Sequence, residues 1–547
     1  MDLLLDIFGF ASVLLSGAVR TAQCLVLGGI AFIACIAVPL ERPTGEGRLL
    51  PRTLRLTRIF AWALLVTVTL ALALQVTILV GTEEITIAEA LGGDFAVAQI
   101  VRIIGAILLL VLLLRSSPSV PLVVALGLID LAAGVATSHA MARIDDRAVL
   151  IAVTALHHLG TAVWIGGLPC FLSAMRWLPA GSRRSLVGAR YSAMSVAAVA
   201  ALALSGLGML IYYVGSVDAM YGTVYGMMLG TKIVLFFSLL ALGYGNFRVV
   251  RRLAVDPGGS VVRLRRFAEV ELGVGITVIF VAASMTSLPP AVDLTRDRAS
   301  LTEITERLIP KWPSLSSPSR DTLAFYEQRK TLADEQAEHK APTLQAYVPG
   351  AGTPLPRNAQ DIAWSEYNHH WAGMFVLLMG ILVLLEKTGR APWARHWPLL
   401  LIVLAGFLFL RSEAEGWPTG SLTLVESLRD PEFIQHKSFM VLMTGFAVFE
   451  WSVRNKVMRN DWAIYVFPVL SAVGGMMLLT HSHSIANVKD LLLMEMSHMP
   501  LAVFAIWSGW ARWLELRLDG RAQIIAGRLW PVLFCMTAIT LLLYREV

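Results

Sequence analysis

The sequence predicts an all-α protein that crosses a membrane many times. Of its 547 residues, 56% are hydrophobic and only 15% are charged, whereas a soluble protein of this size carries about a quarter charged residues. Its mean hydropathy is +0.66. Uncharged apolar runs of about 18 or more residues recur, each long enough to cross a bilayer as a helix. The predicted fold class is a polytopic membrane protein in two bundles, joined by one long outer loop.

Length and hydropathy predict about 14 spans along the chain. They are 8–39, 56–80, 97–114, 119–140, 148–175, 190–215, 223–245, 267–288, 367–386, 396–411, 437–453, 461–480, 491–512 and 527–544. The opening residues have no basic stretch and include Asp2 and Asp6, so we expect a retained first helix and no cleaved signal peptide.

The connections between the spans alternate in charge, which predicts their orientation. The basic ones are 41–58, 176–190, 247–267, 386–397, 453–460 and 512–528. Because Lys and Arg are retained on the cytoplasmic side, both termini are expected on the periplasmic side of a bacterial inner membrane. The net charge of +6 then follows from topology, and no nucleic-acid partner is needed to explain it.

One connection, residues 289–366, is far longer than the rest and is expected on the periplasmic side. It contains a helix-like stretch at 319–340 and divides the chain into three predicted domains. These are an eight-helix membrane domain (1–292), an extracytoplasmic loop (293–366) and a six-helix membrane domain rich in His and Met (367–547).

The histidines gather on one side of the predicted membrane. Of the 11 histidines, only His396 belongs to the inner face. Histidine tolerates membrane interfaces, but the inner interface is equally available, so this tolerance does not explain the bias. Ionisable groups within membrane spans are costly and usually functional. The candidate ligands are His139, His157, His158, His369, His370, His436, His481, His483 and His498.

Methionines accompany several of these histidines at helical spacing. Met440 and Met443 follow His436 at i+4 and i+7, and Met494 lies four residues before His498, so each set shares one helix face. Thioether and imidazole without thiolate favour Cu(I). We therefore predict copper as the bound ion, with lipid around the helices. The four cysteines lie in apolar segments without a CxxC motif and are expected to be small buried side chains.

The same histidines leave two alternatives open. Histidines on neighbouring helices also hold b-type haem through axial ligation, which would make the protein a membrane electron-transfer protein or oxidoreductase subunit. An assembly or structural role is the other alternative. No Walker loop and no Asp-Lys-Thr-Gly site is present, so ATP-driven transport is not expected, and a transporter is favoured over an enzyme.

Three stretches of the first block resemble the copper-resistance D (CopD-like) family. They are a histidine-bearing helix followed by W-x-G-G (155–177), an apolar helix containing Lys232 (225–247), and a closing span that begins with a carboxylate and ends in Leu-Pro-Pro (265–291). The resemblance covers roughly residues 10–292. It implies an inner-membrane protein that moves copper, often supplied by a small periplasmic copper carrier. No carrier domain is recognisable here, and the six-helix block is an addition.

Other ionisable groups fall within the predicted spans. Asp130 and Lys232 lie near the middle of spans 4 and 7, where a mutual ion pair would offset much of their desolvation cost, either as a static link or as part of a gate. Arg102 is expected to extend towards the interface. Glu269 and Glu271 lie near the inner end of span 8, where we expect them to be solvated at the interface; the alternative is that they receive an ion.

Overall fold

The computed structural model describes residues 2–41, 47–83, 85–295, 298–319, 359–413, 416–420, 422–428, 431–480 and 488–546. Every regular element in these ranges is helical. Twelve helices of the described chain are long and apolar enough to cross a membrane. The protein is therefore an all-α polytopic membrane protein, as predicted.

A helix occupies each of the predicted spans. Two of these helices are not among the twelve: α6 (Val120–Ala136), which has only 17 residues, and α19 (Pro431–Arg454). The predicted helix-like stretch at 319–340 lies almost entirely outside the described residues, as do His339, His481 and His483.

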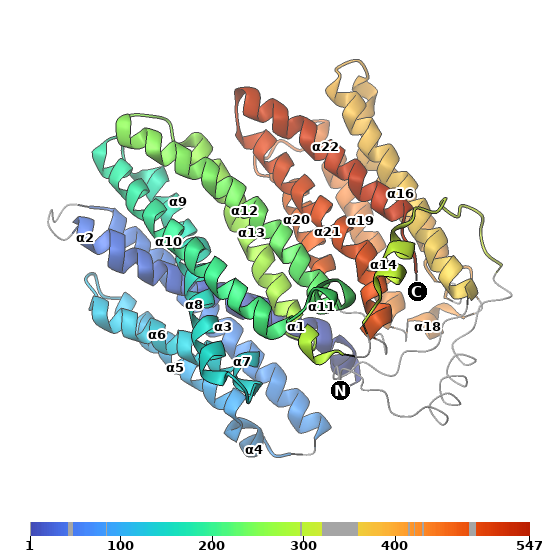
Figure 1. Cartoon of the computed structure of the whole chain (residues 1–547). Coiled ribbons are helices and arrows are strands. Elements are labelled where there is room, and N and C mark those ends of the chain that lie inside the picture. The colour runs from blue at the N-terminus through green and yellow to red at the C-terminus, as the bar shows by residue number, and fades with distance from the viewer. Residues whose placement is uncertain are drawn as a thin grey trace. The chain divides into compact units, whose positions relative to one another are not determined.

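The chain divides into two compact units. Unit 1 comprises mainly Phe10–Met220 and Lys232–Thr295, and unit 2 comprises mainly Arg296–Val547. In Figure 1 they contain the blue-to-green and the yellow-to-red helices respectively. The domain limits predicted at residues 292 and 366 stay a prediction.

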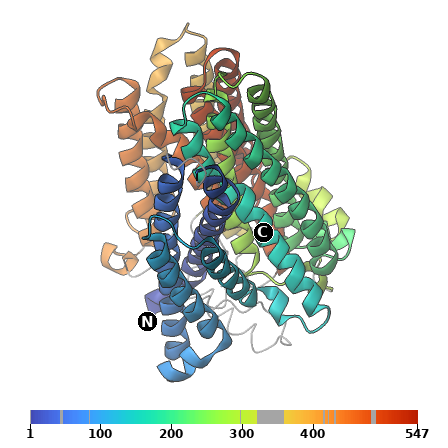
Figure 2. The same ribbon diagram turned by 90° about the vertical axis from the view of Figure 1, so that its left-hand side faces the viewer.

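The elements up to residue 295 are α1 (Asp2–Phe32), η1 (Ile33–Ala37), α2 (Val38–Glu41), α3 (Leu49–Thr82), α4 (Ile87–Gly92), α5 (Asp94–Leu113), α6, α7 (His139–Ala142), α8 (Arg147–Thr161), η2 (Ala162–Gly166), α9 (Leu168–Trp177), α10 (Ser182–Tyr213), α11 (Val217–Gly222), α12 (Val224–Val255), α13 (Val262–Met285) and η3 (Ala291–Asp293). The helices α3, α5 and α6 run side by side in both views (Figures 1 and 2). Their shared core is aliphatic and includes Leu64, Leu109 and Leu113.

Two π-helical turns, η1 and η2, interrupt the helices of unit 1. Such turns are rare and are frequent at functional sites. At η2 the backbones of two helices touch: a Cβ on Gly28 of α1 would lie 2.1 Å from the carbonyl carbon of Gly166, and a Cβ on Gly166 would lie 1.9 Å from the carbonyl oxygen of Cys24. Only glycine allows this approach, so these positions fix α1 against η2.

A buried ion pair joins α5 to α6. The Nε of Arg102 lies 2.9 Å from Oδ1 of Asp130, with both side chains at most 6% exposed, and the amide of Gln23 donates to Oδ2 of Asp130 at 3.0 Å. Asp130 thus pairs with Arg102 in place of the predicted Lys232. Arg102 does not extend to the interface, because this carboxylate stabilises its charge inside the bundle. The proposed gating role of Asp130 and Lys232 stays a prediction.

The described elements after residue 295 are α14 (Leu301–Leu308), α16 (Ala359–Lys387), η5 (Pro392–Leu399), α17 (Leu400–Arg411), α18 (Leu424–Ser427), α19, η6 (Ala463–Tyr465), α20 (Val466–Thr480), α21 (Val488–Arg517) and α22 (Gly520–Leu542). The helix α22 packs against α16 and α21, and α21 packs against α20. Their core contains Met379, Trp397, Phe467 and Trp530.

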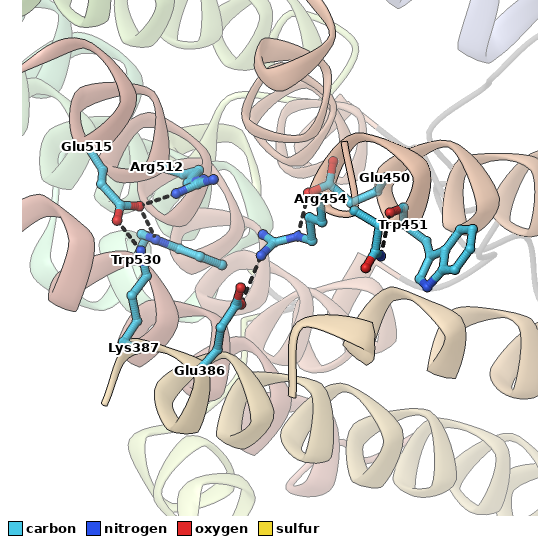
Figure 3. A network of polar contacts seen from close by, with 9 residues as sticks. Glu386, Lys387, Glu450, Trp451, Arg454, Arg512, Glu515 and Trp530 are labelled. Carbon is cyan, nitrogen blue, oxygen red and sulfur yellow. Dashed lines mark hydrogen bonds and ion pairs between the residues drawn. The ribbon is translucent and has the colours of Figure 1, made fainter. Parts of the chain in front are cut away.

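Charged side chains link the helices of unit 2 at one end (Figure 3). Arg454 of α19 donates to Glu450 at 2.8 Å and to Glu386 of α16 at 3.0 Å. Glu515 of α21 accepts from Trp530 of α22 at 2.7 Å and also pairs with Lys387 and Arg512. We assign this network a structural role, since its charges neutralise one another.

We predict that Asp130→Ala destabilises the fold by about 3–5 kcal/mol, because removing one partner of a buried pair leaves the other charge uncompensated. The measurement is detergent-induced unfolding followed by circular dichroism. The double variant Arg102→Leu/Asp130→Leu should recover most of the loss, and Asp145→Ala, at an exposed loop position, is the control. An unchanged unfolding midpoint for Asp130→Ala would contradict the assignment.

Candidate functional site

The helix α8 carries the adjacent histidines of the first predicted site and continues directly into η2. The Nδ1 of His157 lies 3.1 Å from the hydroxyl of Ser205 on α10. That hydroxyl donates to the carbonyl of Ala201 at 2.7 Å, so it accepts from His157. The proton of His157 is then on Nδ1, and Nε2 carries the lone pair that a metal needs. His158 places Nδ1 in the interior, where no partner is found among the described residues.

Positive charge surrounds this histidine pair. Arg20, Arg102 and Lys232 lie close enough for their charges to act on His158, and Lys232 also acts on His157. Asp130 pairs with Arg102, so it does not neutralise Lys232 or Arg20. These charges repel a bare cation at the histidines.

His139 lies on the short helix α7, after the end of α6. Its Nε2 lies 2.8 Å from the carbonyl oxygen of Thr286, at the end of α13, so Nε2 carries the proton and Nδ1 carries the lone pair. The guanidinium of Arg20 donates to the hydroxyl of the same threonine at 3.4 Å. His139 is thus held at the end of α13.

A cavity of about 310 Å³ opens beside η2, between α10, α12 and α13. Its lining is Trp164, Leu168, Phe171, Gly188, Tyr191, Ser192, Ser195, Val196, Val199, Leu240, Gly243, Tyr244, Asn246, Phe247, Val250, Leu264 and Glu271. Most of these side chains are apolar or aromatic, with a few convergent polar groups, which is typical of a binding pocket.

The carboxylate of Glu271 is the acid of this cavity. It is 2% exposed and accepts two hydrogen bonds, from Nε1 of Trp164 at 2.5 Å and from Nδ2 of Asn246 at 2.7 Å. The expectation that Glu271 is solvated is wrong. Glu269, two residues earlier, is only partly buried and pairs with Arg266 at 2.5 Å.

Tyr191 completes the wall of the cavity. Its hydroxyl donates to the carbonyl of Trp164 at 2.5 Å, and its ring stacks on Phe171 with centroids 4.5 Å apart. A Cβ on Gly167 would lie 2.8 Å from the Tyr191 ring. The residues of the W-x-G-G stretch therefore differ in role. Trp164 donates a hydrogen bond to the carboxylate of Glu271. The two glycines allow close packing of the Cys24 backbone and the Tyr191 ring.

In unit 2, two of the predicted histidines meet at one tyrosine. The ring of His369 stacks on Tyr544 at 3.8 Å, and the ring of His498 meets it edge-on at 5.4 Å. Each histidine has Nδ1 near the carbonyl four residues earlier, at Ser365 (2.9 Å) and Met494 (3.2 Å). The hydroxyl of Tyr544 donates to Glu546 at 2.8 Å. Tyr544, which follows α22, thus contacts one histidine of α16 and one histidine of α21.

The remaining predicted ligands of unit 2 have other partners. His370 bonds through Nδ1 to Ser314 and through Nε2 to the carbonyl of Tyr544, at 2.9 and 3.0 Å. His436 pairs with Glu413. Met440 and Met494 are buried, and Met443 is partly buried. Among the described residues, no three His, Cys, Asp or Glu side chains form a group that could hold a metal ion.

Comparison with known proteins connects this chain to copper. Residues 186–285 match the family described as copper resistance protein D. The match covers 100 of the 547 residues. This segment supplies all of α12 and α13 and most of α10. It also supplies 14 of the 17 residues that line the cavity, all but Trp164, Leu168 and Phe171. The resemblance seen in the sequence is confirmed for this segment.

The curated relatives include the copper transport protein CutJ of Bacillus subtilis (strain 168). It is 30% identical over 156 residues, which are 28% of this chain and 28% of that protein. The chain thus matches little more than a quarter of that relative's length. No solved structure matches. Both matches name copper and neither names haem.

The sequence missed Glu271, Asn246 and Tyr191 as parts of one site. The signal was present: Trp164 and Glu271 lie in two of the three family-like stretches. Spacing along the chain did not show that they meet, because 107 residues separate them.

We predict that His139 titrates below the ordinary histidine value of about 6.5. Burial is the largest effect and lowers the pKa of His139. The hydrogen bond with Thr286 raises the pKa by less, Arg20 and Arg143 lower it, and Asp293 has the smallest effect and raises it. Because the folded pKa is below the unfolded one, the contribution of His139 to stability is full above about pH 6.5 and is lost as the pH falls. Nuclear magnetic resonance with labelled histidine, assigned by His139→Asn, measures this. A pKa above 6.5 would contradict the burial argument.

Proposed function

We propose that this protein captures copper at the periplasmic face of the inner membrane and passes it into unit 1, where His157 and His158 are the first ligands it meets. The observation that carries the proposal is the bond between Trp164 and Glu271. It joins the histidine-bearing helix to the wall of the cavity that the copper resistance protein D segment builds. The name of the curated relative also supports copper as the cargo.

Soft ligands continue from the histidines along the same helices. The thiol of Cys24 on α1 lies 3.5 Å from the carbonyl of Thr161, less than one turn beyond His158. Cys170 and Met175 follow on α9, and both are buried. Sulfur and imidazole suit Cu(I) better than they suit a hard ion. We therefore propose that copper moves as Cu(I) along α8, η2 and α9.

The positive charge around the histidines limits the form in which copper enters. Lys232 and Arg20 would repel a bare Cu(I) ion at His158. We propose that copper reaches this point with an anionic ligand, supplied by the medium or by a small periplasmic copper carrier. Lys232 would then hold the anionic ligand while the imidazoles take the metal.

The histidines of unit 2 are proposed to collect copper before it enters unit 1. His369 and His498 meet at Tyr544 on two different helices, and Met494 lies on the helix of His498. This role depends on the predicted topology, in which these residues face the periplasm.

The test is copper binding and copper accumulation by cells that express variants. We expect His157→Ala/His158→Ala to lower Cu(I) bound by the purified protein and cellular accumulation by at least tenfold, since both ring ligands are removed. His396→Gln is the matched control, because His396 bonds to Trp451 in unit 2. Unchanged binding and accumulation in the double variant would refute the assignment.

Replacing Lys232 separates the two parts of the proposal. Lys232→Met removes a like charge worth about 1–3 kcal/mol at an effective dielectric constant of ~20. It should therefore tighten binding of Cu(I) offered without an anionic ligand by about tenfold or more. It should weaken binding of an anionic Cu(I) complex such as Cu(I)–chloride. The same change in both affinities would contradict the role given to Lys232.

A further inference from the structure

Glu271 has no cationic partner in the part of the chain that the structure describes. Its two hydrogen-bond donors, Trp164 and Asn246, are both neutral, and the ion pair on the same helix joins Arg266 to Glu269. A carboxylate at 2% exposure inside a helix bundle is strongly destabilised as an isolated charge. Its charge must be balanced by a bound cation or by a proton.

Asn246 is arranged to bond Glu271 in both protonation states. In the structure its Nδ2 donates to Oε2 of Glu271 at 2.7 Å, as a charged carboxylate requires. Its Oδ1 is buried and is without a partner among the described residues. If Glu271 takes up a proton, rotation of the amide by half a turn presents Oδ1 to the new O–H donor. The orphan oxygen thus gains a partner from the protein in the protonated state.

A proton fits this site better than a metal ion does. Both carboxylate oxygens already accept an N–H, and each keeps a second lone pair that can take a proton without other ligands. The described residues contain no cluster of three His, Cys, Asp or Glu ligands. The cavity of about 310 Å³ has room for on the order of ten waters at ~30 Å³ each. Ser192, Ser195 and Tyr191 line it as polar partners.

The residues that line the cavity differ in exposure. Tyr244 and Val196 are 63% and 55% exposed, whereas Leu264 and Glu271 are buried. Under the predicted topology these residues lie in the cytoplasmic half of the membrane. The titratable groups beside Glu271 in the cavity lining are Tyr191 and Tyr244, and Cys24 and Cys170 act electrostatically on Tyr191. Arg266 and Glu269 lie on the same helix as Glu271 and pair with each other.

We propose that Glu271 is a proton-binding site that couples copper movement to proton movement, with Asn246 as its switching partner. The carboxylate takes one proton from water in the cavity, which changes the charge of the site from −1 to 0, and later releases it. Arrival of Cu(I) along η2 would favour the charged form, because the cation attracts the carboxylate. Copper moving one way would then drive a proton off Glu271. This coupling rests on the proposed copper transport, whereas the proton binding itself does not.

The coupling is tested with the full-length protein in liposomes that contain a pH-sensitive dye. We expect addition of external Cu(I), with an ionophore that clamps the voltage, to move copper and protons together in the wild type. Glu271→Gln should reduce copper-dependent proton movement to the level of empty liposomes. Glu269→Gln, two residues away and outside the cavity lining, is the matched control and should behave as the wild type.

Proton binding is tested separately by infrared difference spectroscopy between high and low pH. The wild type and Glu269→Gln should show the carbonyl band of a protonated carboxylic acid, and Glu271→Gln should lose it. Asn246→Leu should shift that band, because the acid loses its acceptor. This measurement requires only that the variant folds, so it does not depend on transport.

The outcomes distinguish the two proposals. Copper movement without protons in the wild type would overturn the coupling and leave the proposed function standing. No copper movement in the wild type would refute the proposed function, while the infrared band would still decide whether Glu271 binds a proton. Dependence of copper movement on Na⁺ or K⁺ would overturn the proton assignment. So would a Glu271→Gln variant that binds less Cu(I) than the wild type but keeps the infrared band.

Discussion

Polar groups inside the helix bundle must find their partners in the protein, because hydrocarbon offers them none. Two buried acids of unit 1 show how this constraint shapes the molecule. Asp130 binds Arg102 and Gln23, which joins α6 to α5 and α1. Glu271 binds Trp164 and Asn246, which joins α13 to η2 and α12. Both acids therefore hold helices together, although only Asp130 has a cation beside it.

This difference between the acids separates structure from function. A compensated pair such as Arg102 and Asp130 has no reason to change its charge, and breaking it only costs stability. An acid with neutral donors alone can gain or lose a proton while its hydrogen bonds rearrange. The same comparison applies in unit 2, where the network around Arg454 and Glu515 (Figure 3) is internally neutralised.

The continuous run of α8, η2 and α9 gives the proposed copper route a physical basis. It carries His157 and His158 at one end, Trp164 in its π-helical turn and Cys170 beyond it. Because α1 touches η2 through glycine, the thiol of Cys24 comes next to this run. The route therefore needs no large internal channel; it needs neighbouring ligands on packed helices.

The sequence predicted the helices well because their signal is local. Apolar length alone identifies a span, and every predicted span coincides with a helix. The partners could not be predicted in this way, since they depend on which helices are neighbours and how each is rotated. Glu269 and Glu271 illustrate the limit: two residues differ by about 200° around a helix, so one meets Arg266 and the other faces the cavity.

The prediction of which copper ligands meet was limited in the same way, because the sequence does not show how each helix is rotated about its axis. The sequence grouped the histidines by depth, and the structure brings His369 and His498 to Tyr544 but pairs His436 with Glu413. Depth in the membrane follows from counting residues along a span. Direction around the helix axis follows only from packing.

The most direct test that this protein binds copper is the metal content and absorbance spectrum of the protein purified from copper-supplied cells. We expect bound copper at a fixed ratio to protein and no Soret band. A Soret band, or protein that folds and carries no copper even when Cu(I) is added, would contradict it.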